Sequence, residues 1–278
     1  MARPTTRLSN CYVPQLLPSK ETKHVSRTDR PTHSLRQLVI QSSDDDSCLV
    51  ELGHTKVMCR VMVPLYASSP QLPPGVQLNM DQGTLHCEVK YASQIAYPTT
   101  TLLASTASSV DQAQVPAGRI HSWIMSRETE LASGLLTALS AAVPLEAYPK
   151  ACVLVQITVL QDDGSILPAC ILASTVALCR ANVNLLDTIT ACSVAIIQQD
   201  FQTTAWWADP TLEEMIHAKA VVTLSILPNS KVVTLWEQSG IKALSPEETN
   251  RAMDLCRDGC RTMQRFVREH LLSEFTKN

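Results

Sequence analysis

Residues 151–180 read ACVLVQITVLQDDGSILPACILASTVALCR. The first ten residues alternate in polarity and are rich in β-branched side chains, which predicts a strand over 151–160. The tetrapeptide Asp162-Asp163-Gly164-Ser165 predicts a turn, and residues 168–180 are nearly all apolar, which predicts a buried helix. A strand that turns directly into a buried helix is typical of the α/β class.

Outward from this unit, both halves of the chain show strands followed by a helix. The predicted elements are strands at 47–52 and 56–63 joined through Gly53-His54-Thr55, a strand at 84–91, a helix over 126–143, a strand at 189–197, a hairpin of 220–227 and 231–237, and a closing helix from the capping box Ser245-Pro246-Glu247-Glu248. Residues 92–118 are rich in Ser, Thr, Ala and Pro and predict a long surface loop. The predicted fold is therefore α/β (α+β), with mixed sheets and packed helices.

The length of 278 residues allows one large domain or two small ones. We predict an N-terminal arm over 1–25, one domain over 26–272 and a C-terminal tail over 273–278. Of the 8 glycines, the closest two are Gly75 and Gly83, so no glycine-rich dinucleotide or P-loop motif can be written.

Charge is unevenly distributed around a net value of -3. Residues 1–36 are basic, whereas residues 37–246 carry ten Lys and Arg against eighteen acids. Because neutralising phosphates supplies most of the affinity for nucleic acids, the acidic body does not fit an autonomous nucleic-acid binder. Contact with RNA would depend on partners or on a few local arginines.

The 10 cysteines are scattered, with no CxxC pair, and several lie in apolar runs. They are interpreted as small buried hydrophobes in a reducing compartment, and no metal site is predicted. No apolar run is long enough to span a membrane. The first 20 residues lack acids, which fits either a transit peptide or a plain N-terminal tail.

Three pairs of residues could carry chemistry, and each has a simpler interpretation. Asp162-Asp163 could mark an anion site at a helix start or be acids favoured there. Glu213-Glu214 could be a general acid or metal pair or a solvated turn. Trp206-Trp207 could stack on a base, meet a partner or make a plain hydrophobic contact. The arginines at 257, 261 and 265 share a helix face that is expected to be solvated. Composition and spacing alone show no active site.

Several stretches, in order, resemble the RNase PH-type subunits of the RNA exosome. The likeness covers roughly residues 26–272 and is most similar to the short subunits of its ring. The matching segments are Ser26–Arg30 with Ser34–Arg36 (the family's R-x-D-G-R opening, with Pro31 in place of its glycine), Cys48–Val57, Gly83–Val89, Ser126–Leu131, Tyr148–Lys150, Val159–Ser165, Ala208–Thr211, and the final hairpin and helix.

The resemblance implies a duplicated β-α fold, six copies of which form a ring around an RNA channel. It also implies the partners, which are other RNase PH-like subunits in a heterohexameric ring, RNA-binding cap subunits and RNA in the channel, with no membrane and no cofactor. Such a protein takes part in rRNA processing and RNA degradation, in the nucleus, the nucleolus and the cytoplasm.

The family's active-site positions fall on side chains of the wrong chemistry. Its phosphate-binding Thr-Arg pair falls on Ile166 and Leu167, or on Ser165 and Ile166 in a shorter register. Its two catalytic aspartates fall near Met215 and Val221, with Glu214 one residue away. An aliphatic side chain cannot bind phosphate, and neither Met215 nor Val221 has an ionisable group. We therefore predict no catalytic residue.

Two arginines are the predicted RNA-binding residues. The resemblance places the family's helix-start arginine at Arg127, and Arg119 lies in the loop before it. We therefore predict a non-catalytic ring subunit that lines part of the RNA path. The alternatives are an active or partner-completed phosphorolytic 3′-exoribonuclease, in which Glu214 acts as the acid, and an unrelated α/β interaction protein.

Overall fold

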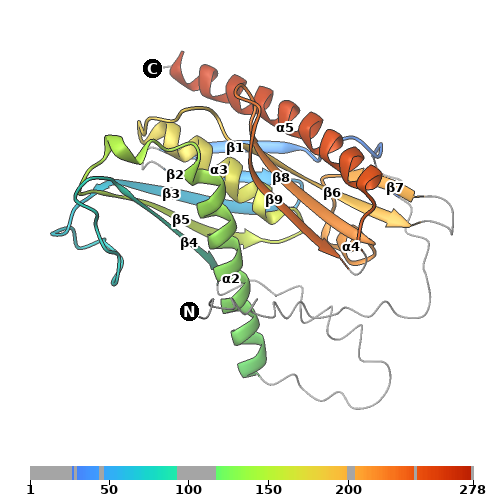
Figure 1. Ribbon diagram of the computed structural model, residues 1–278, viewed down its shortest axis with the longest axis horizontal. Helices are drawn as coiled ribbons and strands as arrows, with labels where there is room; N and C mark the ends of the chain where they lie inside the picture. The colour runs from blue at the N-terminus through green and yellow to red at the C-terminus, as the bar shows by residue number, and fades with distance from the viewer. Residues whose placement is uncertain are drawn as a thin grey trace, which may run out of the picture.

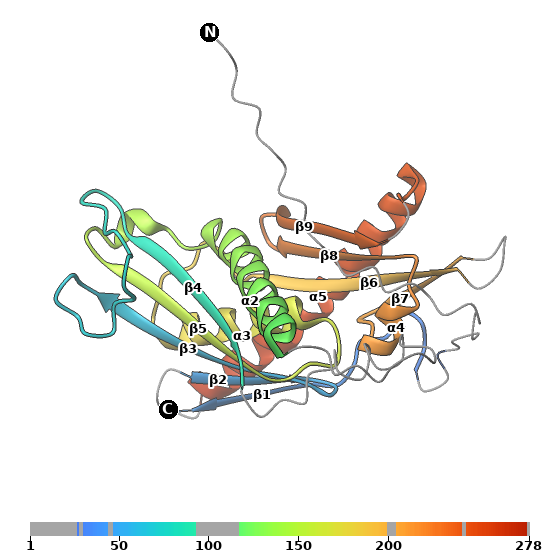
Figure 2. The same cartoon turned by 90° about the horizontal axis from the view of Figure 1, so that it is seen from below.

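The computed structural model describes residues 27, 30–43, 47–92, 117–198, 204–240 and 243–276, without the side chains of 117–121, 123 and 275. These residues form two sheets, in each of which the strand order differs from the order along the chain (Figures 1 and 2). The first has the order β1 (Leu38–Ser43), β2 (Ser47–Leu52), β3 (Thr55–Leu65), β5 (Cys152–Gln161) and β4 (Thr84–Tyr91). The second has the order β7 (Thr204–Ala208), β6 (Thr190–Gln198), β8 (Ala220–Leu227) and β9 (Val232–Gly240). Neighbouring strands are antiparallel except β4 and β5, which are parallel.

Helices join the two sheets and cover them. The helices are α2 (Ala117–Ser140), α3 (Ile166–Arg180), α4 (Leu212–Ile216) and α5 (Pro246–Phe275), with a short 3-10 turn η1 (Leu145–Ala147). Both α2 and α3 contact each sheet, and Figure 2 shows them in the space between the sheets. The long helix α5 packs on β6 and β8. The predicted α/β class with packed helices is confirmed; the first sheet is mixed, and the second is antiparallel throughout.

The predicted hairpin of β2 and β3 turns through Gly53 and His54, since Leu52 pairs with Thr55. Gly53 has a φ of +61°, a left-handed conformation that glycine adopts without steric cost. Alternate side chains of both strands, such as Val50 and Val57, are fully buried against α3. The alternation of apolar and polar residues in the sequence thus reflects a strand whose successive side chains point alternately toward the core and away from it.

The strand-turn-helix unit over 151–180 is confirmed, with the helix starting two residues earlier than predicted, at Ile166. Pro168 lies in the first turn of α3. Backbone N–H groups in a first turn have no acceptor within the helix, so proline, which lacks an N–H, is tolerated there and the helix can begin before it. Every residue from Ile166 to Leu178 is buried.

The helix predicted over 126–143 is shifted toward the N-terminus. It begins at Ala117, because Ile124 continues its buried face. It ends at Ser140, where the Ala142 N–H bonds to the Leu139 carbonyl and tightens the last turn. Most of the predicted loop over 92–118 lies outside the described residues, and its last two residues are helical.

Three short elements were not predicted, namely β1, β7 and α4. Both β1 and β7 are edge strands. The helix α4 has five residues, and a capping box joins Thr211 and Glu214 at its start. Short edge strands and single-turn helices carry too few residues for a clear periodic pattern.

The cysteines pack as the sequence predicted. Eight of the nine described cysteines are buried, and Cys179 is half-buried, while Cys11 lies outside the described residues. Burial raises the pKa of Cys48, Cys87 and Cys260 to about 12, so these thiols stay protonated and behave as small apolar groups.

The described residues include neither a membrane-spanning helix nor a cluster of metal ligands. None of the described helices combines the length and apolar character needed to cross a bilayer. No three His, Cys, Asp or Glu side chains of the described ranges are grouped as metal ligands.

Candidate functional site

The turn between β5 and α3 lies against the loop that joins β7 to α4. Gly164 has a φ of +84°, and a Cβ added there would lie 2.6 Å from the Leu212 nitrogen and from the Thr211 carbonyl carbon. The Leu212 N–H donates to the Asp163 carbonyl over 3.1 Å. The two halves of the chain therefore meet backbone to backbone where the resemblance places the family's active site.

The start of α3 offers no cation. Ser165 is the N-cap residue, with a φ of 50° and no capping hydrogen bond, and its hydroxyl donates to the Pro210 carbonyl over 3.0 Å. Ile166 and Leu167 are 4% and 5% exposed and belong to the main hydrophobic core. The positions that correspond to the phosphate-binding pair are thus committed to packing, not to a ligand.

Glu214 is held in a two-point ion pair with Arg27. The Nε of Arg27 donates to Oε1 of Glu214 over 2.7 Å, and Nη2 donates to Oε2 over 2.6 Å. The Arg27 guanidinium also lies 5.2 Å from the ring centre of Trp207. Only 1% of the Arg27 side chain is exposed, against 9% for Glu214. A desolvated pair of this geometry has two charge-assisted hydrogen bonds and little freedom to separate.

Burial raises the pKa of Glu214, but the hydrogen bonds from Arg27 and from the Thr211 N–H outweigh burial and hold that pKa below its usual range. The interpretation of Glu213-Glu214 as a solvated turn is therefore wrong for Glu214, which is buried in α4, while Glu213 is exposed. The burial comes from Arg27, which approaches from 187 residues away.

Two further arginines bind the same loop. Arg36 donates from Nε and Nη2 to the Asp209 carboxylate over 3.0 and 2.8 Å, and from Nη1 to the Asp163 carbonyl over 2.8 Å. Arg30 donates to the Asp209 carbonyl over 2.6 Å and to Glu214 over 3.3 Å. Burial, followed by the charge of Arg27, lowers the pKa of Arg30.

We call Arg27, Arg30 and Arg36 together with Asp163, Asp209 and Glu214 the arginine-carboxylate cluster. Its six side chains carry three charges of each sign. The acids Asp162 and Asp163 of the turn are also bound within the protein, since Asp162 accepts from the Tyr91 hydroxyl over 3.0 Å and Asp163 lies 3.5 Å from Arg36. Neither acid is part of the first turn of α3.

The two positions that correspond to catalytic aspartates lie beside this cluster and are apolar. Val221 is 7% exposed and packs in a small core with Trp207 and Ala195, and Met215 packs against that core. No proton can be taken or given by either side chain, so neither of these two positions can act as a general acid or base.

Arg127, the first predicted RNA-binding residue, lies on α2 near acids. Its Nη1 donates to Glu130 over 2.9 Å, and 32% of its side chain is exposed. Burial lowers the pKa of Arg127, but Glu130, Tyr91 and Asp162 raise it by more. Glu237 of β9 lies near Arg127 and Glu130. Burial, followed by the charge of Glu130, raises the pKa of the Glu237 carboxyl. The carboxyls of Glu130, Asp162 and Glu237 thus lie near Arg127.

Arg119, the second predicted RNA-binding residue, is in the first turns of α2, and its side chain lies outside the described residues. The remaining candidates are resolved by packing. Trp207 is 1% exposed in the core, which confirms a plain hydrophobic contact, and Trp206 lies under Arg251 at 3.9 Å. Arg257 and Arg261 are exposed and form ion pairs with Asp254 and Asp258 one turn earlier, which is typical of a solvated helix face.

Sequence reasoning did not find the arginine-carboxylate cluster as a unit. In the sequence, the three arginines belong to the matching segments Ser26–Arg30 and Ser34–Arg36, and Asp209 belongs to the matching segment Ala208–Thr211. The signal lies in those two motifs, but nothing in a single sequence says that segments about 180 residues apart meet.

Comparison with known proteins agrees with this geometry. Models of the 3′ exoribonuclease family (RNase PH), domain 1 and domain 2, match residues 34–184 and 187–259. The human exosome complex component MTR3 is 28% identical over 93% of this chain and 90% of its own length, and the exosome complex component Rrp41 of Cenarchaeum symbiosum is 24% identical over 85% and 84%. The crystal structure of rice Rrp46 superposes with a TM-score of 0.67 at 17% identity, and the match covers 88% of this chain and 98% of the rice chain. A chain of an archaeal exosome core superposes with a TM-score of 0.61 at 20% identity, and that match covers 86% of this chain and 89% of the archaeal chain. The chain therefore belongs to the RNase PH-type 3′ exoribonuclease family and spans both of its domains.

Proposed function

We propose that this protein is a non-catalytic subunit of an exosome ring, which supports 3′-to-5′ RNA processing and degradation by completing the ring and lining its channel. The observation that carries the proposal is the packing of Ile166 and Leu167 into the core at the start of α3. A phosphate dianion needs cations and N–H donors, and a hydrocarbon surface supplies neither. The exosome components among its relatives support the ring as the setting.

The alternative, a phosphorolytic exoribonuclease that uses Glu214, requires a carboxyl that can exchange a proton. Both oxygens of Glu214 already accept hydrogen bonds, from Arg27 on each oxygen and from the Thr211 N–H on Oε2. An acid that is kept ionised by a buried guanidinium is a poor proton donor. The geometry therefore favours a structural role for Glu214.

The test is phosphorolysis of a 3′-tailed RNA in the presence of inorganic phosphate. The chain is assayed alone and within a ring reconstituted from the RNase PH-type subunits of its own genome, with nucleoside diphosphates as the readout. No release is expected from the isolated chain, and replacing Glu214 by Gln is expected to leave the activity of the ring unchanged. Steady release that Glu214→Gln abolishes in a ring that still assembles, while Glu213→Gln at the exposed neighbour does not, would contradict the proposal.

The proposal includes RNA contact at Arg119, in the first turn of α2, and at Arg127, which lies in the middle of this helix and not at its start as the sequence predicted. Because three acids surround Arg127, we expect a modest contribution there: in the assembled ring, Arg127→Ala should weaken RNA binding and lower the salt dependence by about one phosphate contact. Arg257→Ala on the solvated face of α5 is the matched control. Equal RNA affinity and salt slope in all three proteins would remove Arg127 from the RNA path. The same proposal places the protein in the nucleus, the nucleolus and the cytoplasm, with RNA-binding cap subunits as further partners.

A further inference from the structure

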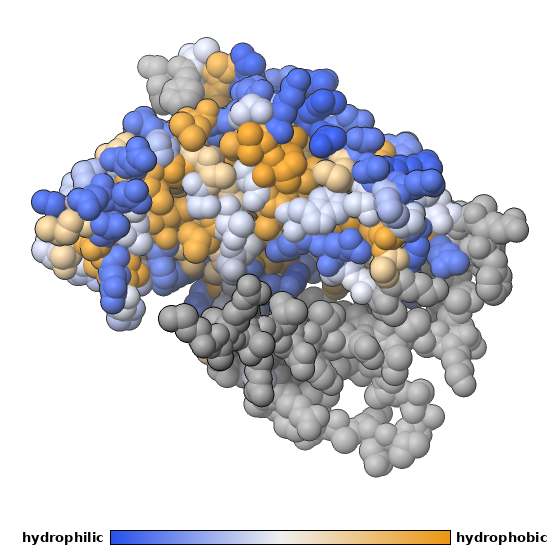
Figure 3. Space-filling view, viewed as in Figure 1, coloured by the Kyte–Doolittle hydropathy of each residue, from blue (hydrophilic) through white to orange (hydrophobic). Residues whose placement is uncertain are grey.

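The charged side chains of α2 all lie before Leu131. No charged residue occurs between Leu131 and Val143. Figure 3 shows apolar side chains gathered over β9 and the adjacent end of α2. Among the side chains of α2 that the structure describes, Arg127 is the one arginine or lysine. Because a phosphate is held mainly by cations, RNA contact by the described part of α2 depends on Arg127.

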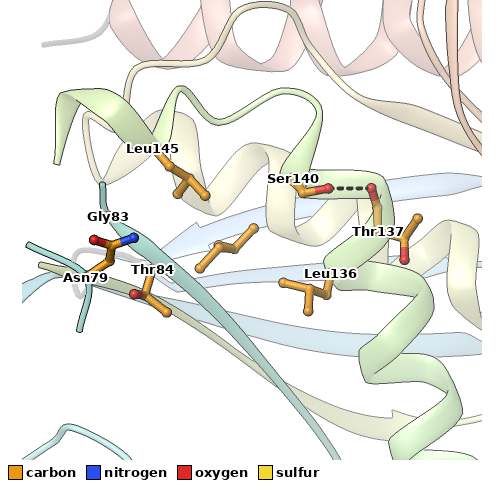
Figure 4. Close-up of a pocket in the computed structure, with 8 residues that line it drawn as sticks. Asn79, Gly83, Thr84, Leu136, Thr137, Ser140 and Leu145 are labelled. Atoms are coloured by element: carbon orange, nitrogen blue, oxygen red, sulfur yellow. Dashed lines mark hydrogen bonds between the residues drawn. The ribbon is translucent and has the colours of Figure 1, made fainter. Parts of the chain in front are cut away.

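The open pocket of about 480 Å³ beside the second half of α2 supplies no cation either. Figure 4 shows Leu136 and Thr137 of α2 on one side of this pocket, with Thr84 and Leu145 across from them. The residues that line the pocket are all uncharged, and they are Asn79, Gly83, Thr84, Leu85, Leu136, Thr137, Ser140 and Leu145. The strength of the contact at Arg127 is therefore set by the groups around Arg127 itself.

Arg127 is held by an acid on its own helix face. Arg127, Glu130 and Gly134 are spaced by three and then four residues, so they lie on one side of α2. The Nη1 of Arg127 donates to Oε2 of Glu130 over 2.9 Å, and 59% of the Glu130 side chain is exposed. An ion pair this exposed to water is weak. A phosphate can therefore replace Glu130 as the partner of Arg127.

Glu237 of β9 brings a second carboxylate to the same side of α2. A Cβ added at Gly134 would lie 3.0 Å from Oε1 of Glu237, so the carboxyl lies directly against the helix. Gly134 follows Glu130 by about one helical turn, roughly 6 Å along the axis. Glu130 and Arg127 are the charged groups of α2 that act on Glu237, and Thr223, opposite Glu237 on β8, does not titrate.

The charges around Arg127 therefore come from both halves of the chain. When both carboxyls are ionised, Arg127, Glu130 and Glu237 carry one positive and two negative charges. The Asp162 carboxylate, which accepts from the Tyr91 hydroxyl over 3.0 Å, adds another negative charge nearby. A phosphate on Arg127 is attracted by the guanidinium and repelled by these carboxylates over longer distances, where the Coulomb energy is smaller but still counts.

We propose that Glu237 limits how tightly Arg127 holds an RNA phosphate, so that the strand is released easily as it moves past this subunit. The inference rests on the RNA contact at Arg127 that belongs to the proposed function. Glu130 is the partner that Arg127 exchanges for the phosphate. Glu237 is a positioning residue, which touches no RNA and acts through its charge beside Arg127. A strand from the second half of the chain thus sets the strength of a contact made by the first half.

The test is a double-mutant cycle on RNA affinity. A fluorescent 3′-tailed RNA is titrated, with anisotropy as the readout, into the assembled ring with wild-type chain, Glu237→Gln, Arg127→Ala or both changes. Glutamine keeps the size of the side chain that lies against Gly134, and thermal unfolding of each variant checks the fold. The matched control is Glu269→Gln, which removes one carboxylate from an exposed position on α5.

We expect Glu237→Gln to bind RNA about threefold more tightly than wild type, and to have no effect once Arg127 is alanine, because its charge acts through Arg127. Burial and the charge of Glu130 raise the pKa of Glu237 above the ordinary value of 4.5. As the pH falls from 7 toward 4.5, Glu237 takes up a proton and loses its charge. The RNA affinity of the wild type should therefore rise relative to that of Glu237→Gln.

Three outcomes would contradict the inference in different ways. Unchanged affinity in Glu237→Gln, while Arg127→Ala still weakens binding, would overturn it and leave the RNA contact at Arg127 standing. A gain in Glu269→Gln as large as that in Glu237→Gln, or an undiminished gain in the double variant, would show a general effect of net charge and overturn it as well. Equal affinity of wild type and Arg127→Ala would instead overturn the contact in the proposed function, and the inference with it.

Discussion

At the residue scale, the molecule is organised by arginines that precede the first strand and by carboxylates that come from the second half of the chain. Arg27 and Glu214 are both buried, and each satisfies the charge of the other. Removing one member of a buried ion pair costs more than the pair contributes, because the remaining charge stays desolvated and unpaired. The Arg27–Glu214 ion pair therefore matters for the stability of the fold.

We expect Arg27→Ala to lower the free energy of unfolding by about 3 kcal/mol, because Glu214 would keep only the hydrogen bond from the Thr211 N–H and the longer contact with Arg30. Urea denaturation followed by tryptophan fluorescence measures the change. Arg257→Ala, which breaks the exposed pair with Asp254, should change stability by less than about 0.5 kcal/mol. A similar small effect for both variants would show that the Arg27 pair is not a buried, coupled one.

The Glu214 carboxyl should also make stability depend on pH. Its pKa in the folded protein lies below the ordinary value of 4.5, so its ionised form stabilises the fold above pH 4.5, and this contribution is lost as the pH falls through the folded pKa. Glu214→Gln should therefore flatten the loss of unfolding free energy on acidification below pH 4.5, whereas Glu213→Gln should not. Equal acid slopes for wild type and Glu214→Gln would contradict this assignment.

At the element scale, the turn from β5 into α3 depends on a residue without a side chain. Gly164 combines a left-handed backbone with close contacts to the backbone of Thr211 and Leu212, which cannot move aside like the end of a flexible side chain. The contact carries the loop that supplies Asp209 and Glu214 to the arginines. The strand-turn-helix unit therefore positions the second half of the site as well as the first.

Gly164→Ala should lower the free energy of unfolding by about 3 kcal/mol. This value combines the cost of a left-handed conformation at alanine with the cost of displacing the backbone of Thr211 and Leu212. Gly75→Ala is the matched control, since Gly75 has a φ of +90° with no atom near the added Cβ, and we expect about 1 kcal/mol. The difference between the two, measured by chemical denaturation, isolates the contact with the α4 loop. No difference would mean that the loop yields without cost.

At the scale of the whole molecule, the two sheets share their cores. The main core contains residues of the first sheet together with Leu227 of β8 and Met263 and Val267 of α5. Leu35 packs against this core and also against the core under α5. Although the family models divide the chain in two, the packing joins both parts into one structure.

The protein should therefore unfold in one transition, with tryptophan fluorescence and far-ultraviolet circular dichroism giving the same midpoint. Leu35→Ala should lower the stability by about 2 kcal/mol and leave the two midpoints coincident, because it weakens both cores together. The exposed Leu272→Ala serves as the control, with a change below about 0.5 kcal/mol. Separate transitions in the wild-type protein would show that the two parts fold independently.

The sequence by itself determined the elements whose patterns are local. Alternating residues over 47–63 and 151–160 and the apolar run over 168–180 specify strands and a buried helix, because strand and helix periods are set by the backbone. The aliphatic character of Ile166 and Leu167, to which the resemblance assigns the family's phosphate-binding pair, was also visible in the sequence.

Only the tertiary structure decided the edge strands β1 and β7 and the burial of Glu214. Each depends on which distant segments meet, since Arg27 lies 187 residues from Glu214. A glutamate in a turn and a glutamate in a buried ion pair have the same local sequence, since burial is a property of the packed chain. The sequence of this protein thus specifies its elements, and their packing decides which charged groups are enclosed and which apolar groups are left exposed.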